Sequence, residues 1–102
     1  MGATTEDKRS IIITPGRDVV ASMASAFKAE LHAIVKEKPA KLIIDLTGVE
    51  MIDSIGIGVI IAAYNSLKNI GGILEVANAS NDIYNAFLAM RLNHHFCVTK
   101  AG

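Results

Sequence analysis

Ser54 is the residue whose type and surroundings most favour chemistry. It follows Asp53, a good helix-capping residue, and comes after a short apolar run typical of a strand. A serine in the first turn of a helix lies beside unpaired backbone N–H groups and the positive end of the helix dipole. We therefore expect an exposed serine at a position that suits a phosphate.

Hydrolysis is the alternative chemistry for this serine, because Asp53, Ser54 and His94 or His95 are the residue types of a hydrolase. The serine lacks the G-x-S-x-G surroundings of a nucleophile elbow. The G-x-G segment at 56–58 lacks the lysine of a phosphate-binding P-loop. We predict that the chain is not an enzyme and holds no cofactor.

The histidines and the single cysteine do not indicate a metal site. Cys97 is the only cysteine, so the chain has no cysteine cluster and no internal disulfide. It stands between Phe96 and Val98, and we expect a buried thiol with a packing role. His94 and His95 are adjacent, and on the strand expected there their side chains would point to opposite sides.

Length and charge restrict the fold and the partners. The chain has 102 residues, 51% of them hydrophobic, which suits one small domain with a modest core. Ten basic and ten acidic residues give a formal net charge of zero, so no positive field favours nucleic acid or an anionic membrane. The N-terminus lacks a signal-peptide core, and no apolar run reaches transmembrane length. We expect a cytoplasmic protein without direct membrane contact.

Strands and helices alternate along the predicted chain. Residues 1–9 are expected to be disordered and residues 10–102 to form the domain. Strands are expected at Ser10–Thr14, Leu42–Ile44, Ile73–Ala77 and His94–Val98, and helices at Val19–Lys38, Asp53–Ile70 and after 78–82. This order predicts an α/β fold with a mainly parallel four-stranded sheet and three to four helices. An extra N-terminal edge strand is left open.

Two local features refine this prediction. The unbroken run of isoleucines at 11–13 is typical of a strand that is covered on both faces. Asp18 follows a Pro-Gly turn and precedes the first helix, so we expect it to cap that helix.

The helix expected at 53–70 has two apolar faces. Val59, Ala63, Leu67 and Ile70 form the face predicted to lie on the sheet, and Ile57, Ile60, Ile61 and Tyr64 form the second. The first charge after Asp53 is Lys68, so the second face favours a partner over internal packing.

Gly56 and Gly58 fall in the first turns of this helix, where each costs about 0.5–1 kcal/mol relative to alanine. Close approach of another chain would explain them, and so would tight packing of the helix on its own sheet. The sequence leaves both explanations open.

The segment at 42–58, LIIDLTGVEMIDSIGIG, resembles the signature of STAS domains, especially bacterial anti-sigma factor antagonists. The shared features are the strand, the acidic loop and the D-S-x-G-x-G start of the helix. The similarity extends through Gly71-Gly72 and the later elements, so it covers roughly 10–100. The resemblance implies the STAS fold.

The resemblance also implies a function. Ser54 matches the serine that is phosphorylated by a partner that is both an anti-sigma factor and a serine kinase. The unphosphorylated form would bind that partner and so regulate transcription, and phosphorylation would release it. With the second apolar face, the expected partner-binding residues are Asp53, Ser54, Ile55, Gly56, Ile57, Gly58, Ile61 and Tyr64.

A STAS interaction or scaffold module is the alternative function. Such a module would act in a stressosome-like, chemotaxis-linked or lipid-transport complex, and it would not need a modified serine. Incorporation of phosphate at Ser54 distinguishes the two functions. The sequence leaves a homo-oligomer open for both.

Overall fold

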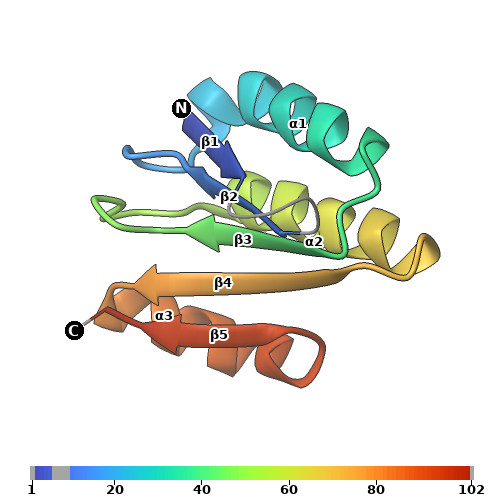
Figure 1. Ribbon diagram of the computed structural model, residues 1–102. Coiled ribbons are helices and arrows are strands. Elements are labelled where there is room, and N and C mark those ends of the chain that lie inside the picture. The colour runs from blue at the N-terminus through green and yellow to red at the C-terminus, as the bar shows by residue number, and fades with distance from the viewer. Residues whose placement is uncertain (1, 6–9, 102) are drawn as a thin grey trace.

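A five-stranded sheet forms the frame of the molecule. The computed structural model describes residues 2–5 and 10–101, and its strands are β1 (Gly2–Thr5), β2 (Ser10–Thr14), β3 (Lys41–Asp45), β4 (Ile73–Ala79) and β5 (Cys97–Lys100). They lie in the order β1-β2-β3-β4-β5 (Figure 1). Strands β2 to β5 are parallel, and β1 pairs antiparallel with β2. The predicted parallel sheet is confirmed, and the edge strand that the sequence left open is present.

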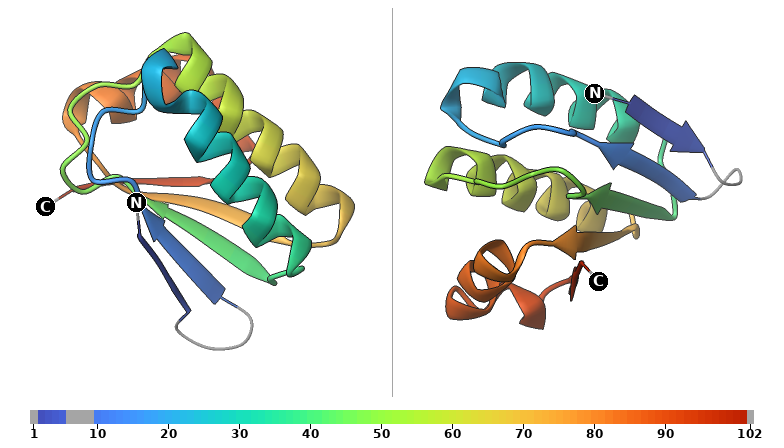
Figure 2. Two further views of the ribbon diagram at one scale, coloured as in Figure 1. Left: turned by 90° about the horizontal axis from the view of Figure 1, so that it is seen from above. Right: turned by 90° about the vertical axis from the view of Figure 1, so that its left-hand side faces the viewer.

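Three α-helices cover one face of this sheet. They are α1 (Ala21–Lys36), α2 (Ser54–Asn69) and α3 (Asn81–Ala89), and a 3₁₀ turn, η1 (Leu92–His94), follows them. Figure 2 shows all three helices on the same side of the sheet. This arrangement follows from the strand order, because right-handed crossovers that all step in one direction place their helices on one face.

The strands are therefore covered on one face only. In β2, Ile11 and Ile13 are buried, while Ile12 between them is half-buried. In β3, Ile43 is half-buried in the same way. The prediction that the isoleucine run is covered on both faces is wrong, because no helix lies on the far side of β2.

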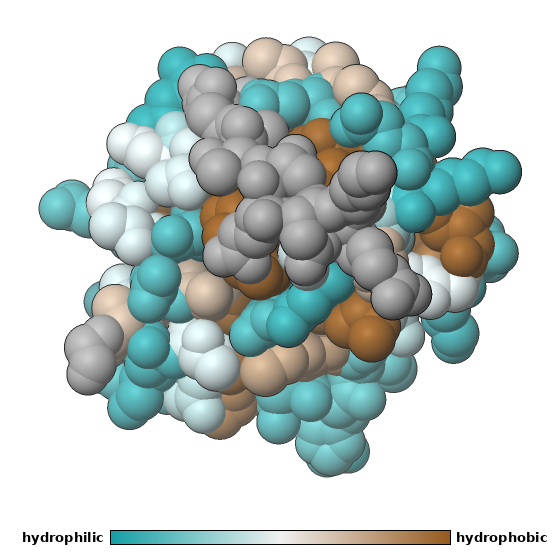
Figure 3. Space-filling model, in the orientation of Figure 1, coloured by the Kyte–Doolittle hydropathy of each residue, from teal (hydrophilic) through white to brown (hydrophobic). Residues whose placement is uncertain are grey.

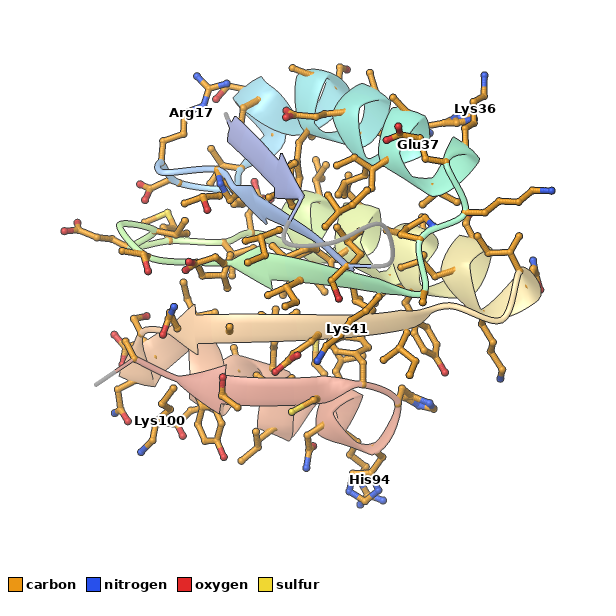
Figure 4. The ribbon with its side chains drawn as sticks, in the orientation of Figure 1. Arg17, Lys36, Glu37, Lys41, His94 and Lys100 are labelled. Atoms are coloured by element: carbon orange, nitrogen blue, oxygen red, sulfur yellow. The ribbon has the colours of Figure 1, made fainter. Side chains whose placement is uncertain are left out.

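The open face of the sheet mixes apolar and charged side chains. Figure 3 shows apolar patches on this face that hydrophilic groups interrupt. Lys41, near the middle of the view in Figure 4, forms an ion pair of 2.8 Å with Glu75. Ile73 is 61% exposed beside them. Such interspersed charges are common on the solvated face of a sheet.

The core lies between the sheet and the helices. Its largest fully buried side chains are Ile13, Leu42, Ile44, Leu74 and Val76 from the strands and Phe27, Ile60, Leu67 and Phe87 from the helices. They come from alternate positions along the strands and from three- and four-residue steps along the helices. Within residues 10–101 no polar or charged side chain is buried with them.

The ends of the chain differ from the sequence prediction. Gly2–Thr5 form β1, where disorder is predicted for 1–9, while residues 1 and 6–9 lie outside the described part. The last strand begins at Cys97, because Arg91 adopts a left-handed conformation (φ 58°) and the chain then turns through η1 to His94. Cys97 is exposed on the open face, so the predicted buried thiol is wrong.

Candidate functional site

Ser54 is the first residue of α2 and is exposed. Two loops set its position, one at 15–20 after β2 and one at 46–53 after β3. The N–H of Val19 donates to the carbonyl of Met51 at 2.9 Å, and the N–H of Asp53 donates back to the carbonyl of Val19 at 3.2 Å. These two hydrogen bonds join the loops at the carboxyl edge of the parallel strands. Both α1 and α2 begin at this edge.

The carboxylate of Asp53 joins the starts of both helices. Its Oδ1 accepts from the N–H of Gly56 at 2.8 Å, which confirms Asp53 as the cap of α2. Its Oδ2 accepts from the N–H of Ala21, the first residue of α1, at 2.9 Å. The hydrogen bond from Gly56, followed by that from Ala21, holds the pKa of Asp53 below its ordinary value. Ser54 thus stands next to a carboxylate that is ionised at neutral pH.

Asp18 ties the same loops together from the other side. Its Oδ1 accepts from the N–H groups of Glu50 and Met51, both at 3.1 Å. The prediction that Asp18 caps the first helix is wrong, since α1 has no side-chain cap. Val19 instead forms a strand-like bridge with Ile52, which delays the start of the helix.

Asp45 fixes the beginning of the loop that leads to Ser54. Its Oδ1 accepts from the N–H of Thr47 at 3.0 Å, from the Thr47 hydroxyl at 2.7 Å and from the Asn78 amide at 3.0 Å. Burial of Asp45 raises its pKa, but the hydrogen bonds from Asn78 and Thr47 outweigh burial and leave the pKa below its ordinary value. The contacts with Thr47 are typical of a turn after β3. The contact with Asn78 joins the end of β3 to the end of the neighbouring strand β4.

The two glycines of α2 have different surroundings. A Cβ on Gly56 would lie 2.2 Å from the carbonyl oxygen of Val19, so this glycine is required by packing within the domain. A Cβ on Gly58 would have no other heavy atom within 4 Å. Internal packing therefore explains Gly56 and does not explain Gly58.

Two large apolar side chains lie exposed next to Ser54 in the chain. Met51 is 59% exposed and Ile55 is 52% exposed, and Gly58 is exposed one turn further along α2. We call Met51, Ser54, Ile55 and Gly58 the Ser54 surface. Sequence analysis missed Met51. The one available signal is that an apolar residue follows Glu50 in the loop before the helix cap, and this signal does not say whether the side chain is exposed.

The faces of α2 differ in part from the prediction. The buried residues of α2 are Gly56, Ile57, Ile60, Ala63 and Leu67. Val59 is half-buried and packs against the core, whereas Ile70 is 40% exposed and does not belong to the core face as predicted. Ile60, predicted on the second face, is fully buried. Gly56 and Ile57, both expected to contact a partner, are buried in the domain. The side chain of Ile57 is therefore not available for such a contact.

Ile61 and Tyr64 are both half-buried on α2. They line a small pocket of about 190 Å³ with Leu92, His95 and Phe96. The ring of Tyr64 lies 5.5 Å from that of Phe96 and 5.9 Å from that of His95, measured between ring centroids. Tyr64 thus belongs to an aromatic cluster that packs α2 against the turn before β5. Ile61 lies three residues after Gly58, so it continues the side of α2 that begins at Ser54.

The structure does not bring a histidine to Ser54. His95 contacts Tyr64, which lies ten residues along α2 from the serine, or about 15 Å of helix axis. His94 lies at the end of η1, at the opposite end of the molecule in Figure 4 from the loop of Arg17. Within residues 2–5 and 10–101, no group of three His, Cys, Asp or Glu side chains could hold a metal ion. No helix in this part of the chain is long and apolar enough to cross a bilayer.

The sheet order, the capped α2 and its leading serine agree with a known family. The model of the STAS domain family matches residues 3–100, and the chain belongs to this family. None of the curated proteins is similar enough in sequence to count as a relative.

Solved structures share the fold at low sequence identity. A protein described as a candidate anti-sigma factor antagonist from Thermotoga maritima has a TM-score of 0.87 and 19% identity, over 97% of this chain and 85% of that one. The Bacillus cell fate determinant SpoIIAA, in its phosphorylated form, has a TM-score of 0.76 and 15% identity, over 95% and 88%. A sulfate transporter family protein from Wolinella succinogenes has a TM-score of 0.74 and 21% identity, over 86% and 74%.

Proposed function

We propose that this STAS domain is an anti-sigma factor antagonist whose partner binding is switched off by phosphorylation of Ser54. The observation that carries the proposal is the exposed serine at the first position of α2, next to the exposed side chains of Met51 and Ile55. An anti-sigma factor with serine kinase activity, acting in the cytoplasm, is the proposed partner. Likeness in fold to anti-sigma factor antagonists, SpoIIAA among them, supports the proposal.

The charge of a phosphate explains how such a switch works. Phosphoserine carries about −1.5 to −2 charges at pH 7. On Ser54 this charge would lie next to the ionised carboxylate of Asp53 and between the apolar side chains of the Ser54 surface. A partner that covers this surface would have to remove water from the phosphate and accept the repulsion.

The fold itself tolerates the same charge. Ser54 is exposed and stands at the positive end of the α2 dipole, which favours an anion. The two hydrogen bonds of the Asp53 carboxylate join it to the N–H groups of Gly56 and Ala21 and do not involve the Ser54 hydroxyl. Phosphorylation therefore weakens a complex without unfolding the domain.

The test begins with the protein purified from its own cells. Mass spectrometry is expected to find phosphate on Ser54. Partners are then captured with the wild type and with Ser54→Asp, and a protein bound by the wild type is expected to be lost from the variant. The captured protein, given ATP, should phosphorylate the wild type and should not phosphorylate Ser54→Ala.

Ser25→Asp is the matched control, because Ser25 is exposed on α1 and the substitution adds the same charge. It should keep the partner. Capture by Ser54→Asp at the wild-type level, with no phosphate on Ser54, would exclude the switch.

A STAS scaffold module within a larger complex is the second candidate. The likeness in fold to a sulfate transporter family protein favours it, since the same fold occurs there. Such a module would keep its partners in Ser54→Asp and would lose them on Ile55→Lys, which changes the exposed apolar contact.

A further inference from the structure

A groove of about 360 Å³ lies between α1 and α2, toward their carboxyl ends. One wall carries the basic side chains Lys28, His32 and Lys36 from α1, and Lys38 follows them just beyond the helix. The three residues of α1 are four apart, so they form a row along one side of the helix. Figure 4 shows Lys36 at the end of this row.

The other wall is uncharged. It consists of small and apolar side chains of α2, among them Val59, Ala62, Ser66 and Ile70. Ile70 is 40% exposed at the end of this wall. Among the residues that the structure describes, no acidic side chain lines the groove. The groove thus combines a row of positive charge with an apolar wall parallel to it.

We infer that this groove binds an amphipathic helix of a partner protein that carries carboxylates four residues apart beside an apolar stripe. Residues four apart on a helix are separated by about 6 Å along its axis, so Lys28 to Lys36 span about 12 Å. A helix laid along the groove repeats its own side chains at the same interval. Each basic side chain can then meet one carboxylate, while the apolar stripe packs on α2.

The row of basic side chains favours a helix over a small amphipathic anion. A fatty acid has one carboxylate and would use one of these side chains.

A second copy of this chain does not supply the complementary helix. The acidic residues of its helices are Glu30 in α1 and Asp82 in α3, and α2 has none. No two of them stand four apart on one helix, so charge complementarity indicates a different protein.

The groove starts next to the Ser54 surface and extends away from it along α2. Val59 at its near end follows Gly58, whereas Ser66 lies twelve residues from Ser54, or about 18 Å of helix axis.

A titration followed by NMR tests the inference. The probe is a 15-residue helical peptide with glutamates at three positions four apart and leucines on the adjacent stripe. Added to the ¹⁵N-labelled domain, it is expected to cause saturable shifts in the amides of 28–38 and 59–70. Ser54→Asp should bind the probe like the wild type, so this result does not depend on the proposed switch.

The double variant Lys28→Glu with Lys36→Glu is expected to weaken binding at least tenfold. Arg17→Glu with Lys68→Glu is the control, since both residues are exposed, lie outside the groove and change the net charge equally. A probe with lysines in place of the glutamates should bind the first double variant and fail to bind the wild type. This exchange shows that the variant is folded.

Three results would overturn the inference. The first is equal affinity of the probe for the two double variants. The second is unchanged affinity when the glutamates of the probe are replaced by glutamine. The third is a groove that saturates with dodecanoate and ignores the peptide, which would indicate a small amphipathic ligand.

Discussion

Gly56 and Gly58 are two residues apart in α2 but have opposite requirements. Gly56 faces the carbonyl of Val19 and has no room for a methyl group. Gly58 stands on the exposed side of α2 with open space beside it. Of the two, Gly58 alone is free to serve the close approach of a partner.

Alanine at these two positions should therefore change stability in opposite directions. Gly56→Ala is expected to lower the free energy of unfolding by about 1–3 kcal/mol, because the helix must move away from Val19. Gly58→Ala should raise it by about 0.5–1 kcal/mol, the usual gain for alanine over glycine in a helix. Urea unfolding of both variants measures the difference. A stable Gly56→Ala protein would contradict the close contact with Val19.

The carboxylate of Asp53 predicts a dependence of stability on pH. Its pKa is lowered in the folded state, chiefly by the N–H of Gly56 and then by that of Ala21. The unfolded chain, with an aspartate pKa of about 3.9, therefore binds a proton more readily than the folded domain does. The stabilisation is complete above the unfolded pKa and is lost as pH falls through the folded pKa.

Urea unfolding between pH 6 and pH 2.5 checks this dependence. The free energy of unfolding should fall as pH decreases below about 4. Asp53→Asn should show a shallower fall, since one titrating group is removed. Asp82→Asn, which removes an exposed carboxylate from α3, is the matched control for the loss of one acidic side chain. Parallel curves for the wild type and Asp53→Asn would show that Asp53 does not contribute.

At the scale of elements, α2 has separate packing and exposed faces within one turn. Ile60 is fully buried against the sheet, whereas Ile55 is 52% exposed next to Ser54. Ile60→Ala is expected to cost about 2–5 kcal/mol of unfolding free energy through the lost packing. Ile55→Ala should change stability by about 0.5 kcal/mol or less.

In a partner-capture experiment, Ile55→Ala should have the larger effect and Ile60→Ala the smaller one. If the Ser54 surface is the contact, Ile55→Ala weakens capture although the domain is as stable as the wild type. Capture by Ile60→Ala should be normal at temperatures where that variant is folded, which circular dichroism establishes. Normal capture by Ile55→Ala would place the contact elsewhere on the domain.

At the scale of the whole molecule, β1 closes one edge of the sheet. It pairs with β2 over Gly2–Thr5, so it covers the backbone of the isoleucine-rich strand. A chain that begins at Ser10 would expose that backbone as an unpaired edge. We expect it to be less stable and to self-associate, which sedimentation velocity at several concentrations would detect.

Ile12→Lys in the shortened chain is a useful comparison. Ile12 is half-buried on the open face of β2, and a lysine on an exposed edge strand opposes pairing between chains. The substitution should restore the monomer without restoring stability. A shortened chain that is monomeric and as stable as the full chain would show that β1 is dispensable.

The sequence alone determined the order of the strands and helices from β2 to β5 and the capped start of α2 at Ser54. Hydrophobic periodicity predicted the order of strands and helices, and Asp53 was correctly predicted as the cap of α2. These features depend on residues close together in the chain, so local patterns contain them. The match of residues 3–100 to the STAS domain family agrees with the resemblance of 42–58.

The tertiary structure alone decided what surrounds the serine. The second hydrogen bond of Asp53 reaches Ala21, and Asp18 holds the loop of Met51 and does not cap a helix. Gly56 is required by a carbonyl 37 positions earlier in the chain. One-sided covering of the sheet left Cys97 exposed. These features depend on segments that are distant in the sequence. The crossovers between parallel strands decide how those segments pack, so no local sequence pattern contains them.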